Sequence, residues 1–289
     1  MTNFKIRRNQ IKKKFIMKIT ALVENTTVNK ELKHKHGLSL YIETQQHKIL
    51  FDLGPNALFL ENAKKLGIDI SKVDTVVISH GHNDHGGGLR TFMKENAKAK
   101  IYIHKDAFKR TYTKAYGLML PIGLDNSIMD NPRVILTDGQ LRLDEELFLF
   151  SGTSTNDFWA DSNNCLYIKD EQGRHLDEFN HEQYLIIKEN GKHMLISGCA
   201  HRGIVNITAE AEKLTGESMH WCISGFHLYD PVKKTCEDES RVKQIAERCL
   251  ESDTQFITCH CTGKVGYGIL KKEMGERIDY ISTGRTMEF

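Results

Sequence analysis

The chain has 289 residues, of which 39% are hydrophobic and 27% are charged, a composition typical of a globular protein with a sizeable core. Its 40 basic and 38 acidic residues give a formal net charge of +2, so charge alone does not favour a protein that binds nucleic acid. No apolar run is long enough to cross a membrane. Seven cysteines at irregular spacing indicate reduced thiols, which we expect in a cytoplasmic protein.

The first residues of the chain form a basic segment. Residues 1–18 contain seven lysines and arginines and no acidic residue, and no apolar stretch follows that would make this segment a secretory signal. An extension that binds an acidic partner is one interpretation, and a solvated tail is the simpler one. We predict a peripheral extension at residues 1–16 and a single domain at residues 17–289, whose first strand covers residues 19–23.

Five apolar runs each end close to a polar residue of a type found in catalytic sites. Continuous apolar runs are typical of strands that are buried on both faces, and ligands in layered α/β folds bind beyond the carboxyl ends of such strands. The runs at 49–51, 76–78, 194–196, 221–223 and 256–257 lead to Asp52, His80, His201, His227 and His260. Because five such runs are spread over most of the chain, we predict one shared pocket.

Helices are predicted between these strands. Apolar residues recur at helical spacing within 204–214 and 242–250, and a further helix at 56–66 ends before Gly67. Alternating strands and helices on both sides of the middle of the chain predict an α/β fold, in which two sheets pack face to face between helices. Residues 105–180 are less regular, and we expect them to form an irregular insertion beside the pocket.

The segment Ser79–Gly88 carries three histidines and an aspartate directly behind a predicted strand. They are His80, His82, Asp84 and His85, in the pattern His-x-His-x-Asp-His. Imidazole and carboxylate groups are ligands of borderline divalent metals. The spacing does not place these side chains on one helical face, and the glycines that follow let the backbone turn tightly. The alternative interpretation is a polar loop that is rich in histidine by chance.

The pattern resembles the signature of the metallo-β-lactamase superfamily, whose fold is an αββα sandwich of two mixed sheets flanked by helices. This resemblance implies two divalent metal ions, with zinc as the first choice and manganese or iron as alternatives. The implied ligands are His80, His82 and His201 for the first ion, and Asp84, His85 and His260 for the second. Asp52 lies where the family has a carboxylate that braces the metal loop, and Asp84 would also take or orient a proton.

One position departs from the family pattern. Many members carry a bridging aspartate after the strand at 221–223, where this chain has Phe226 followed by His227. Either the bridge is missing, or His227 replaces it as a ligand, or His227 faces the substrate as a catalytic or binding residue; a buried histidine with a structural role is the remaining interpretation. Without a bridge, two dications would face a single carboxylate, and such a positive pocket favours an anionic substrate such as a phosphate or pyrophosphate.

Further segments narrow the resemblance within the superfamily. Residues 197–207, 225–228 and 260–263 are similar to those of the dihydropterin–ribofuranosylaminobenzene 5'-phosphate synthase subgroup, which joins a pterin diphosphate to an arylamine ribose phosphate. The resemblance covers most of residues 18–289. At 151–156, however, the subgroup's Thr-Gly-Glu-Ile-Pro-Arg-like element is replaced by Ser-Gly-Thr-Ser-Thr-Asn, which lacks both the acid and the arginine. The resemblance therefore implies the fold and leaves the substrate open.

Several polar residues adjoin the implied ligands. The candidates for contact with an anionic substrate are Arg202, Asn206, Thr262 and Lys264, and for Lys264 a place on a helix surface is an equal alternative. Cysteine thiolates bind zinc well, but packing of the strand ends is the simpler explanation for Cys199, Cys259 and Cys261. The histidines in polar segments are predicted to be surface residues: His34, His36, His47, His175, His181, His193 and His220.

These features predict a metal-dependent, hydrolase-like enzyme that acts on an anionic phosphorylated small molecule, with a pterin-type compound as one candidate. The alternatives are a synthase that displaces diphosphate and a non-catalytic metal-dependent sensor. A di-iron oxygen or nitric oxide reductase is disfavoured, because that branch usually has a glutamate where this chain has His82. A nuclease is disfavoured by the charge balance. We expect neither a nucleic-acid nor a membrane partner, and a homo-oligomer stays open.

Overall fold

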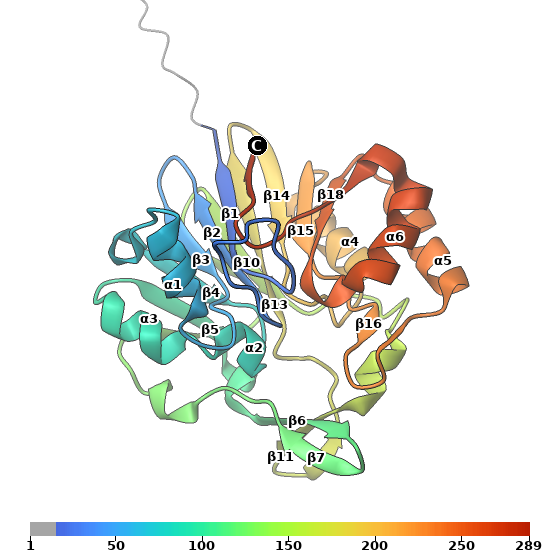
Figure 1. Cartoon of the computed structure of the whole chain (residues 1–289), viewed down its shortest axis with the longest axis horizontal. Helices are drawn as coiled ribbons and strands as arrows, with labels where there is room; N and C mark the ends of the chain where they lie inside the picture. Colours follow the sequence, from blue (N-terminus) through green and yellow to red (C-terminus); the bar gives the residue numbers. More distant parts are fainter. Residues whose placement is uncertain (1–15) are drawn as a thin grey trace, which may run out of the picture.

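The computed structural model describes residues 16–289, in which two β-sheets pack face to face between two layers of helices (Figure 1). The αββα sandwich predicted from the sequence is therefore confirmed. The predicted basic extension at residues 1–16 lies outside the described residues, apart from Ile16. The predicted first strand is present as β1, Lys18–Val23.

The first sheet has seven strands and contains both antiparallel and parallel pairs. Its order is β20 (Thr286–Glu288), β1, β2 (Ser39–Glu43), β3 (Lys48–Phe51), β4 (Thr75–Ile78), β5 (Lys100–His104) and β8 (Val134–Thr137). The pairs from β20 to β3 are antiparallel, and those from β3 to β8 are parallel. All four residues of β4 are buried, as expected for a strand that is covered on both faces.

The second sheet repeats this pairing pattern. Its order is β9 (Leu141–Arg142), β10 (Leu147–Ser151), β13 (Gln183–Glu189), β14 (Lys192–Ile196), β15 (Trp221–Ser224), β18 (Gln255–Thr258) and β19 (Ile278–Tyr280). The pairs from β9 to β14 are antiparallel, and those from β14 to β19 are parallel. Each half of the chain thus contributes a run of parallel strands, whose carboxyl ends are the expected place for a binding site.

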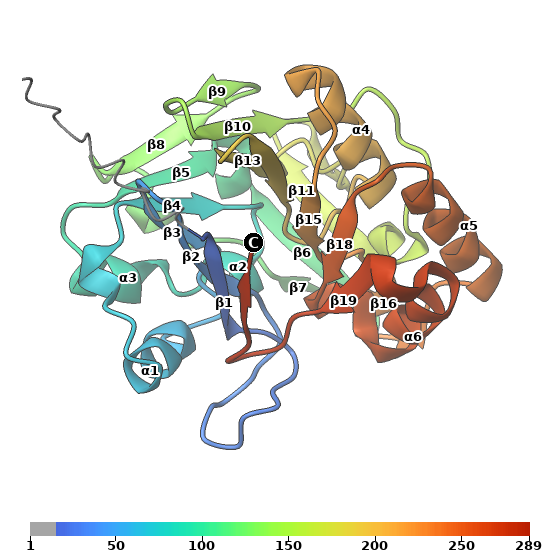
Figure 2. The same cartoon turned by 90° about the horizontal axis from the view of Figure 1, so that it is seen from above.

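Helices cover the outer face of each sheet (Figure 2). The first sheet packs against α1 (Leu58–Lys65) and α3 (Leu89–Glu95), and the second against α4 (Ile204–Thr215), α5 (Glu239–Leu250) and α6 (Gly263–Met274). A third hydrophobic core, which includes Ile42 and Leu185, joins the inner faces of the two sheets. The short helix α2 (Asn83–Gly86) follows β4. None of the described helices combines the length and apolar content that crossing a membrane requires.

The predicted helices are present with small shifts at their ends. α1 begins two residues later than predicted, where the side-chain oxygen of Asn56 accepts a hydrogen bond from the backbone N–H of Leu58 at 3.0 Å. α5 begins three residues earlier, because Asp238 caps its first turn. α4 ends at Thr215, because the next residue, Gly216, has a left-handed conformation that stops the helix. α6 was not predicted from the sequence.

Residues 105–180, expected to be an irregular insertion, contain more regular structure than the sequence indicated. Part of this range forms a separate antiparallel sheet of β12 (Gly173–Leu176), β11 (Leu166–Asp170), β6 (Arg110–Ala115) and β7 (Leu118–Pro121), which lies at the bottom of Figure 1. Strands β8, β9 and β10 of the same range complete the two main sheets. A small pair, β16 (Tyr229–Asp230) and β17 (Thr235–Cys236), follows β15. Single 3-10 turns include η4 (Asp161–Cys165) and η5 (His260–Thr262).

Candidate metal centre

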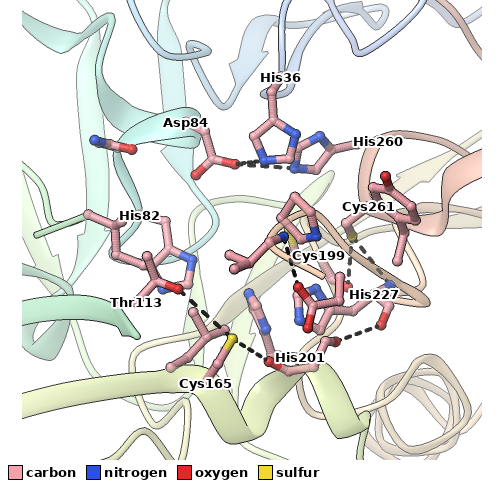
Figure 3. A pocket seen from close by; sticks show the side chains of 18 residues that line it. His36, His82, Asp84, Thr113, Cys165, Cys199, His201, His227, His260 and Cys261 are labelled. Atoms are coloured by element: carbon pink, nitrogen blue, oxygen red, sulfur yellow. Dashed lines mark hydrogen bonds and ion pairs between the residues drawn. The ribbon is translucent and has the colours of Figure 1, made fainter. Parts of the chain in front are cut away.

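The loops that follow the parallel strands of both sheets meet in one place. The first sheet supplies Asp52 and His80 after β3 and β4, and the second supplies His201, His227 and His260 after β14, β15 and β18. A cavity of about 170 Å³ opens beside them (Figure 3). The loops approach closely because Gly198 has no side chain: a Cβ atom there would lie 2.3 Å from the Oγ atom of Ser79. The structure therefore brings the five predicted strand ends together.

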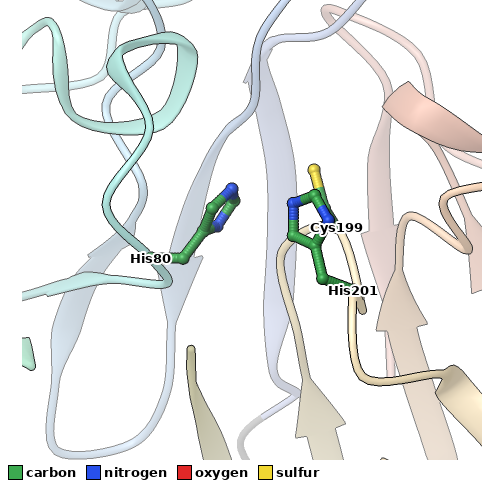
Figure 4. Close-up of side chains that lie close together, drawn as sticks. All are labelled: His80, Cys199 and His201. Carbon is green, nitrogen blue, oxygen red and sulfur yellow. The ribbon is translucent and has the colours of Figure 1, made fainter. Parts of the chain in front are cut away.

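His80, His82 and His201 form the first compact set of nitrogen ligands. The Nε2 atom of His80 lies 3.0 Å from Nδ1 of His82, and the His201 ring centroid lies 4.9 Å and 5.1 Å from those of His80 and His82. Figure 4 shows the rings of His80 and His201 facing each other from loops of the two sheets. Within residues 16–289, the buried Nε2 atom of His201 has no hydrogen-bond partner. An unpartnered buried imidazole nitrogen in such a set fits a metal ligand.

Asp84, His85 and His260 form a second set beside the first. The Nε2 atoms of His85 and His260 lie 3.2 Å apart, and Oδ2 of Asp84 lies 3.7 Å and 3.3 Å from these two nitrogens. In Figure 3 the Asp84 carboxylate points from α2 toward His260 on the opposite loop. Three ligand atoms at these separations fit one tetrahedral metal ion with an open position.

Hydrogen bonds to the Nδ1 atoms orient the histidines of both sets. Nδ1 of His201 lies 2.9 Å from the side-chain oxygen of Asn163, and Nδ1 of His260 lies 2.8 Å from that of Asn25. In each case the bond leaves Nε2 free to face the centre, which is how outer partners fix the tautomer of a metal-binding histidine. Neither asparagine was identified from the sequence.

Asp52 braces the loop that carries the His-x-His-x-Asp-His motif. This buried carboxylate accepts hydrogen bonds from the backbone N–H of Ser79 at 2.7 Å and from the Ser79 hydroxyl at 2.7 Å. It also accepts one from Nδ1 of His85 at 2.6 Å. Because an ionised carboxylate can only accept, the Nδ1 atom of His85 carries a proton and its Nε2 atom faces the second ligand set. Asp52 thus contacts both the backbone and a histidine of this loop.

Burial and neighbouring charges set the protonation of these groups. Burial lowers the pKa of His80 and His201 well below the usual value and lowers that of His82 to about 3, so all three are neutral near pH 7. Burial alone would also lower the pKa of His85, but the carboxylates of Asp52 and Asp84 together raise it to about 9. Neutral imidazoles are the form that binds metal, so a metal ion at the second set would displace a proton from His85.

Cys199 lies between the two sets, contrary to the expectation that it merely packs a strand end. Its Sγ atom is 3.2 Å from Nε2 of His85. Sγ also lies within 4.8 Å of ligand atoms of His80 and His201, and within 4.8 Å of those of His85 and His260. The position is buried. Cys259, by contrast, packs in the hydrophobic core between the sheets, as predicted. The seven cysteines are all free.

The side chains of Phe226 and His227, which stand where many family members have a bridging aspartate, point in different directions. Phe226 is buried in the core beneath α4 and α5, away from the two ligand sets. His227 lines the cavity, and its ring centroid lies 4.0 Å from that of His201. Neither ring nitrogen of His227 has a hydrogen-bond partner among the described residues. Among the interpretations left open by the sequence, this geometry favours a histidine that faces a metal or a substrate.

Four of the nine described non-glycine residues with positive φ angles lie in the same loops. Asp52, Ala200, His227 and His260 all have positive φ angles, between 49° and 59°. Such angles are uncommon for residues other than glycine and persist where the surrounding structure holds them. Their occurrence beside four of the converging strand ends is typical of a functional site.

The four residues proposed from the sequence as anion contacts do not line the cavity. Arg202 donates hydrogen bonds to Thr153, Asn156, Asn180 and the backbone of Glu178. The side-chain amide of Asn206 donates hydrogen bonds to the backbone oxygens of Asp157 and Arg202. The hydroxyl of Thr262 accepts a hydrogen bond from the backbone N–H of Phe226. Lys264 is exposed. The structure thus corrects the prediction for Arg202, Asn206, Thr262 and Lys264, because their polar atoms hold loops together or face solvent.

The corrected role of Arg202 makes a testable prediction. Replacing Arg202 with alanine should lower the free energy of unfolding by about 1–3 kcal/mol, since several hydrogen-bond acceptors lose their donor. Lys264→Ala should change it by less than about 0.5 kcal/mol, as for an ordinary surface position. Urea denaturation measures both, and metal content should stay unchanged. Unchanged stability in Arg202→Ala would contradict the structural role.

Two histidines that were predicted to lie at the surface, His181 and His193, are buried instead. Nδ1 of His181 accepts a hydrogen bond from the backbone N–H of Gly81 at 3.1 Å, and its Nε2 lies 2.9 Å from Asp177. His181 and Asp177 therefore hold the backbone of the loop that carries the His-x-His-x-Asp-His motif in place. His36 is exposed as predicted, but its Nε2 lies 3.2 Å from Asp84 at the cavity. The sequence analysis did not associate either His36 or His181 with the site.

The cavity is lined by both apolar and polar side chains. The separate four-stranded sheet and the segment from β16 to β17 contribute apolar and hydroxyl groups, among them Thr113, Ile122, Leu166, Tyr229 and Val232. No lysine or arginine of the described chain lines it. Apart from the ligand sets, the only carboxylate among the lining residues that the structure describes is Asp230. The cavity alone thus offers no fixed positive charge to a ligand.

Comparisons with known proteins agree with this fold. The family model of the metallo-β-lactamase superfamily matches residues 34–158. An uncharacterised protein of Methanocaldococcus jannaschii is 30% identical over 253 residues, which cover 85% of this chain and 90% of that protein. The 7,8-dihydropterin-6-methyl-4-(β-D-ribofuranosyl)-aminobenzene-5'-phosphate synthase of the same organism is 29% identical over 290 residues, which cover 94% of this chain and 97% of the synthase.

A solved structure supports the same assignment. The crystal structure of a metal-dependent hydrolase of the β-lactamase superfamily matches with a TM-score of 0.78 and 25% identity, covering 94% of this chain and 99% of the other. The fold and the candidate ligand groups together support a metal-dependent enzyme. On the matching family model, the relatives and the shared architecture, the chain belongs to the metallo-β-lactamase superfamily.

Proposed function

We propose that this protein is an enzyme that holds two divalent metal ions and acts on an anionic, phosphorylated small molecule. The observation that carries the proposal is the pairing of two compact ligand sets, His80–His82–His201 and Asp84–His85–His260, beside one cavity. Ligands of one tetrahedral ion lie about 3.5 Å apart when the metal–ligand bonds are about 2.0–2.3 Å long, and the atoms of the second set are 3.2–3.7 Å apart.

The cavity walls suit a substrate with a charged part and an apolar part. Because no described lysine or arginine lines the cavity, the attraction for an anion depends on the metal centre. Two bound divalent ions would stabilise negative charge on phosphate oxygens and lower the pKa of a bound water. Ile122, Leu166 and Val232 offer the rest of the substrate an apolar surface. A pterin-type ring is one candidate for that part.

His227 and Asp84 are the proposed catalytic residues. His227 lines the cavity with both ring nitrogens unpartnered, so one of them can hold or release a proton at a substrate oxygen. Asp84 also lines the cavity, and His36 and His260 lie 3.2 Å and 3.3 Å from its Oδ2 atom. With Oδ2 directed at the ligand set, the second oxygen of Asp84 is the group that would orient a nucleophile.

Hydrolysis and displacement of diphosphate are two forms of this proposal, because both develop negative charge on phosphate oxygens. Similarity to the M. jannaschii synthase over 97% of its length favours displacement. The loss of the acid and the arginine at residues 151–156 favours a different substrate from that of the resembling subgroup. A non-catalytic sensor that only binds metal is the third possibility.

Elemental analysis of the purified protein tests the metal centre. We expect about two equivalents of zinc, manganese or iron per chain and loss of bound metal in the double variant His82→Ala/Asp84→Ala, because each set loses one ligand. His34→Ala, which removes an exposed histidine, is the matched control and should keep the wild-type content. A metal-free wild type, or a double variant that retains both ions, would contradict the proposal.

The metal-loaded protein then distinguishes the reactions. Release of inorganic phosphate from phosphoesters in water alone indicates a hydrolase. Release of pyrophosphate from an alkyl diphosphate only when an arylamine is present indicates a synthase. Loss of either activity in His227→Ala, with metal content retained, would support the catalytic role of that residue. Absence of both activities in the fully loaded protein would favour the sensor.

A further inference from the structure

We propose that the thiolate of Cys199 is a ligand shared by the two metal ions, in place of the bridging carboxylate that this chain lacks. The inference rests on the proposed dinuclear centre and names one of its ligands. Neither the His-x-His-x-Asp-His motif nor the ligand sets implied by the family resemblance include this residue.

The position of the sulfur carries the argument. Sγ of Cys199 adjoins both ligand sets: it lies within 4.8 Å of ligand atoms of His80 and His201, and within 4.8 Å of those of His85 and His260. Its separation from Nε2 of His85 is 3.2 Å, close to the spacing of about 3.5 Å between two ligands of one tetrahedral ion. Figure 4 shows the Cys199 sulfur next to the His201 ring, with the His80 ring across from both.

The surroundings of Cys199 are not those of a packing residue. Cys222, Cys249 and Cys259 each belong to one of the hydrophobic clusters formed by the described residues, and Cys199 belongs to none of them. It is only 3% exposed and lines the cavity, and its sulfur lies close to polar ligand atoms. His201 belongs to the same group; this residue is 1% exposed, and its Nε2 atom has no hydrogen-bond partner among the described residues.

Charge and chemical softness favour the same assignment. Two dications would otherwise share Asp84 as their one anionic ligand, because Asp52 already bonds the far side of His85. A thiolate formed by loss of the thiol proton on metal binding supplies a second negative charge at the centre of the site. Sulfur ligands also select zinc, cobalt or iron over manganese and magnesium. With Cys199 as a bridging ligand, we therefore expect the bound metal to be zinc, cobalt or iron.

Cys261 is the competing thiol. Its sulfur lies in a third group with Cys199 and His227, but it accepts a hydrogen bond from the backbone N–H of His227 at 3.3 Å. It also lies 3.5 Å from the backbone oxygen of Cys199. Cys261 does not occur in either group that joins Cys199 to two predicted ligand histidines, His80 with His201 and His85 with His260. The geometry thus assigns the bridge to Cys199 and a supporting position to Cys261.

X-ray absorption of the wild-type protein loaded with zinc tests the bridge without any substitution. A shared thiolate gives one sulfur per zinc at about 2.3 Å, whereas a sulfur bound to only one ion gives half that number. Two bound zinc ions without sulfur would overturn this inference and leave the dinuclear proposal intact. Half a sulfur per zinc would overturn the sharing. Failure to bind zinc at all would overturn both.

Cobalt substitution then identifies the sulfur. The cobalt protein should show a thiolate-to-metal charge-transfer band in the near ultraviolet, which Cys199→Ser and Cys199→Asp should lose while Cys222→Ser, the matched buried cysteine, should keep it. The carboxylate of Cys199→Asp should still bridge, so this variant should retain two cobalt ions. A band that persists in Cys199→Ser and disappears in Cys261→Ser would overturn the assignment.

Discussion

Asp52→Asn should weaken metal binding at the second ligand set by about 10- to 100-fold, the usual effect of removing an outer partner of a ligand histidine. The carboxylate of Asp52 accepts from the backbone N–H of Ser79 and from Nδ1 of His85. The backbone N–H of Ser79 can only donate, so in Asp52→Asn the amide oxygen must still accept from it. The NH₂ group of the asparagine therefore faces Nδ1 of His85. His85 must then accept at Nδ1 and carry its proton on Nε2, the atom that should bind metal.

Competition with a chromophoric chelator measures this change in affinity for each of the two ions. Glu182→Gln is the matched control, because this buried carboxylate accepts from the backbone N–H groups of His201 and Arg202 and contacts no ligand ring. It should cost stability without a comparable loss of metal affinity. Wild-type affinity for both ions in Asp52→Asn would contradict the tautomer argument.

The strand ends of this site could be predicted because their signals are local. A buried strand appears as a short apolar run, and the polar residue that follows it marks the carboxyl end, as at β4 and His80. The pocket then follows from the general rule that such ends meet at one edge of a layered fold. Asp52 could be placed for the same reason, since β3 leads directly to it.

The residues that support the ligands could not be predicted, because long-range contacts define their roles. Asn163 and Asn25 stand 38 and 235 positions from the histidines that they orient. His181 lies 100 positions from Gly81, in a segment whose polar character indicated the surface. Only the folded chain brings these residues together, and nothing in the local pattern separates them from ordinary loop residues.

The predictions for Cys199 and Arg202 were wrong for the same kind of reason. Cys199 and Cys222 both lie at or near a predicted strand, yet only the three-dimensional structure shows that one sulfur faces ligand atoms and the other packs in a core. Arg202 stands next to a ligand in sequence, but its guanidinium turns to residues 153–180. α6 contains Gly266 and Gly268, which weaken the helical signal, and packing against the second sheet overrides that weakness.

Phe226→Asp should destabilise the protein by at least about 4 kcal/mol instead of restoring a bridge between the metals. Phe226 is 3% exposed and packs edge-on against Phe256, with their ring centroids 5.9 Å apart. Its surroundings include Ile204 and Ile245 beneath α4 and α5. The substitution leaves a cavity, which alone costs about 3–5 kcal/mol for a buried phenylalanine, and it adds a carboxylate without a partner. Urea denaturation measures the loss.

Phe226→Leu is the control for loss of volume and should cost only about 1–2 kcal/mol, because the site stays apolar. The same aspartate placed one residue later, in His227→Asp, enters the cavity instead of the core, since His227 lines it. That variant should fold and bind two metal ions, because a carboxylate beside His201 can approach the centre. A stable Phe226→Asp protein that binds metal more tightly would show that a side chain at position 226 can reach the metal ions. It would contradict our argument that no bridge forms here because this side chain points into the core.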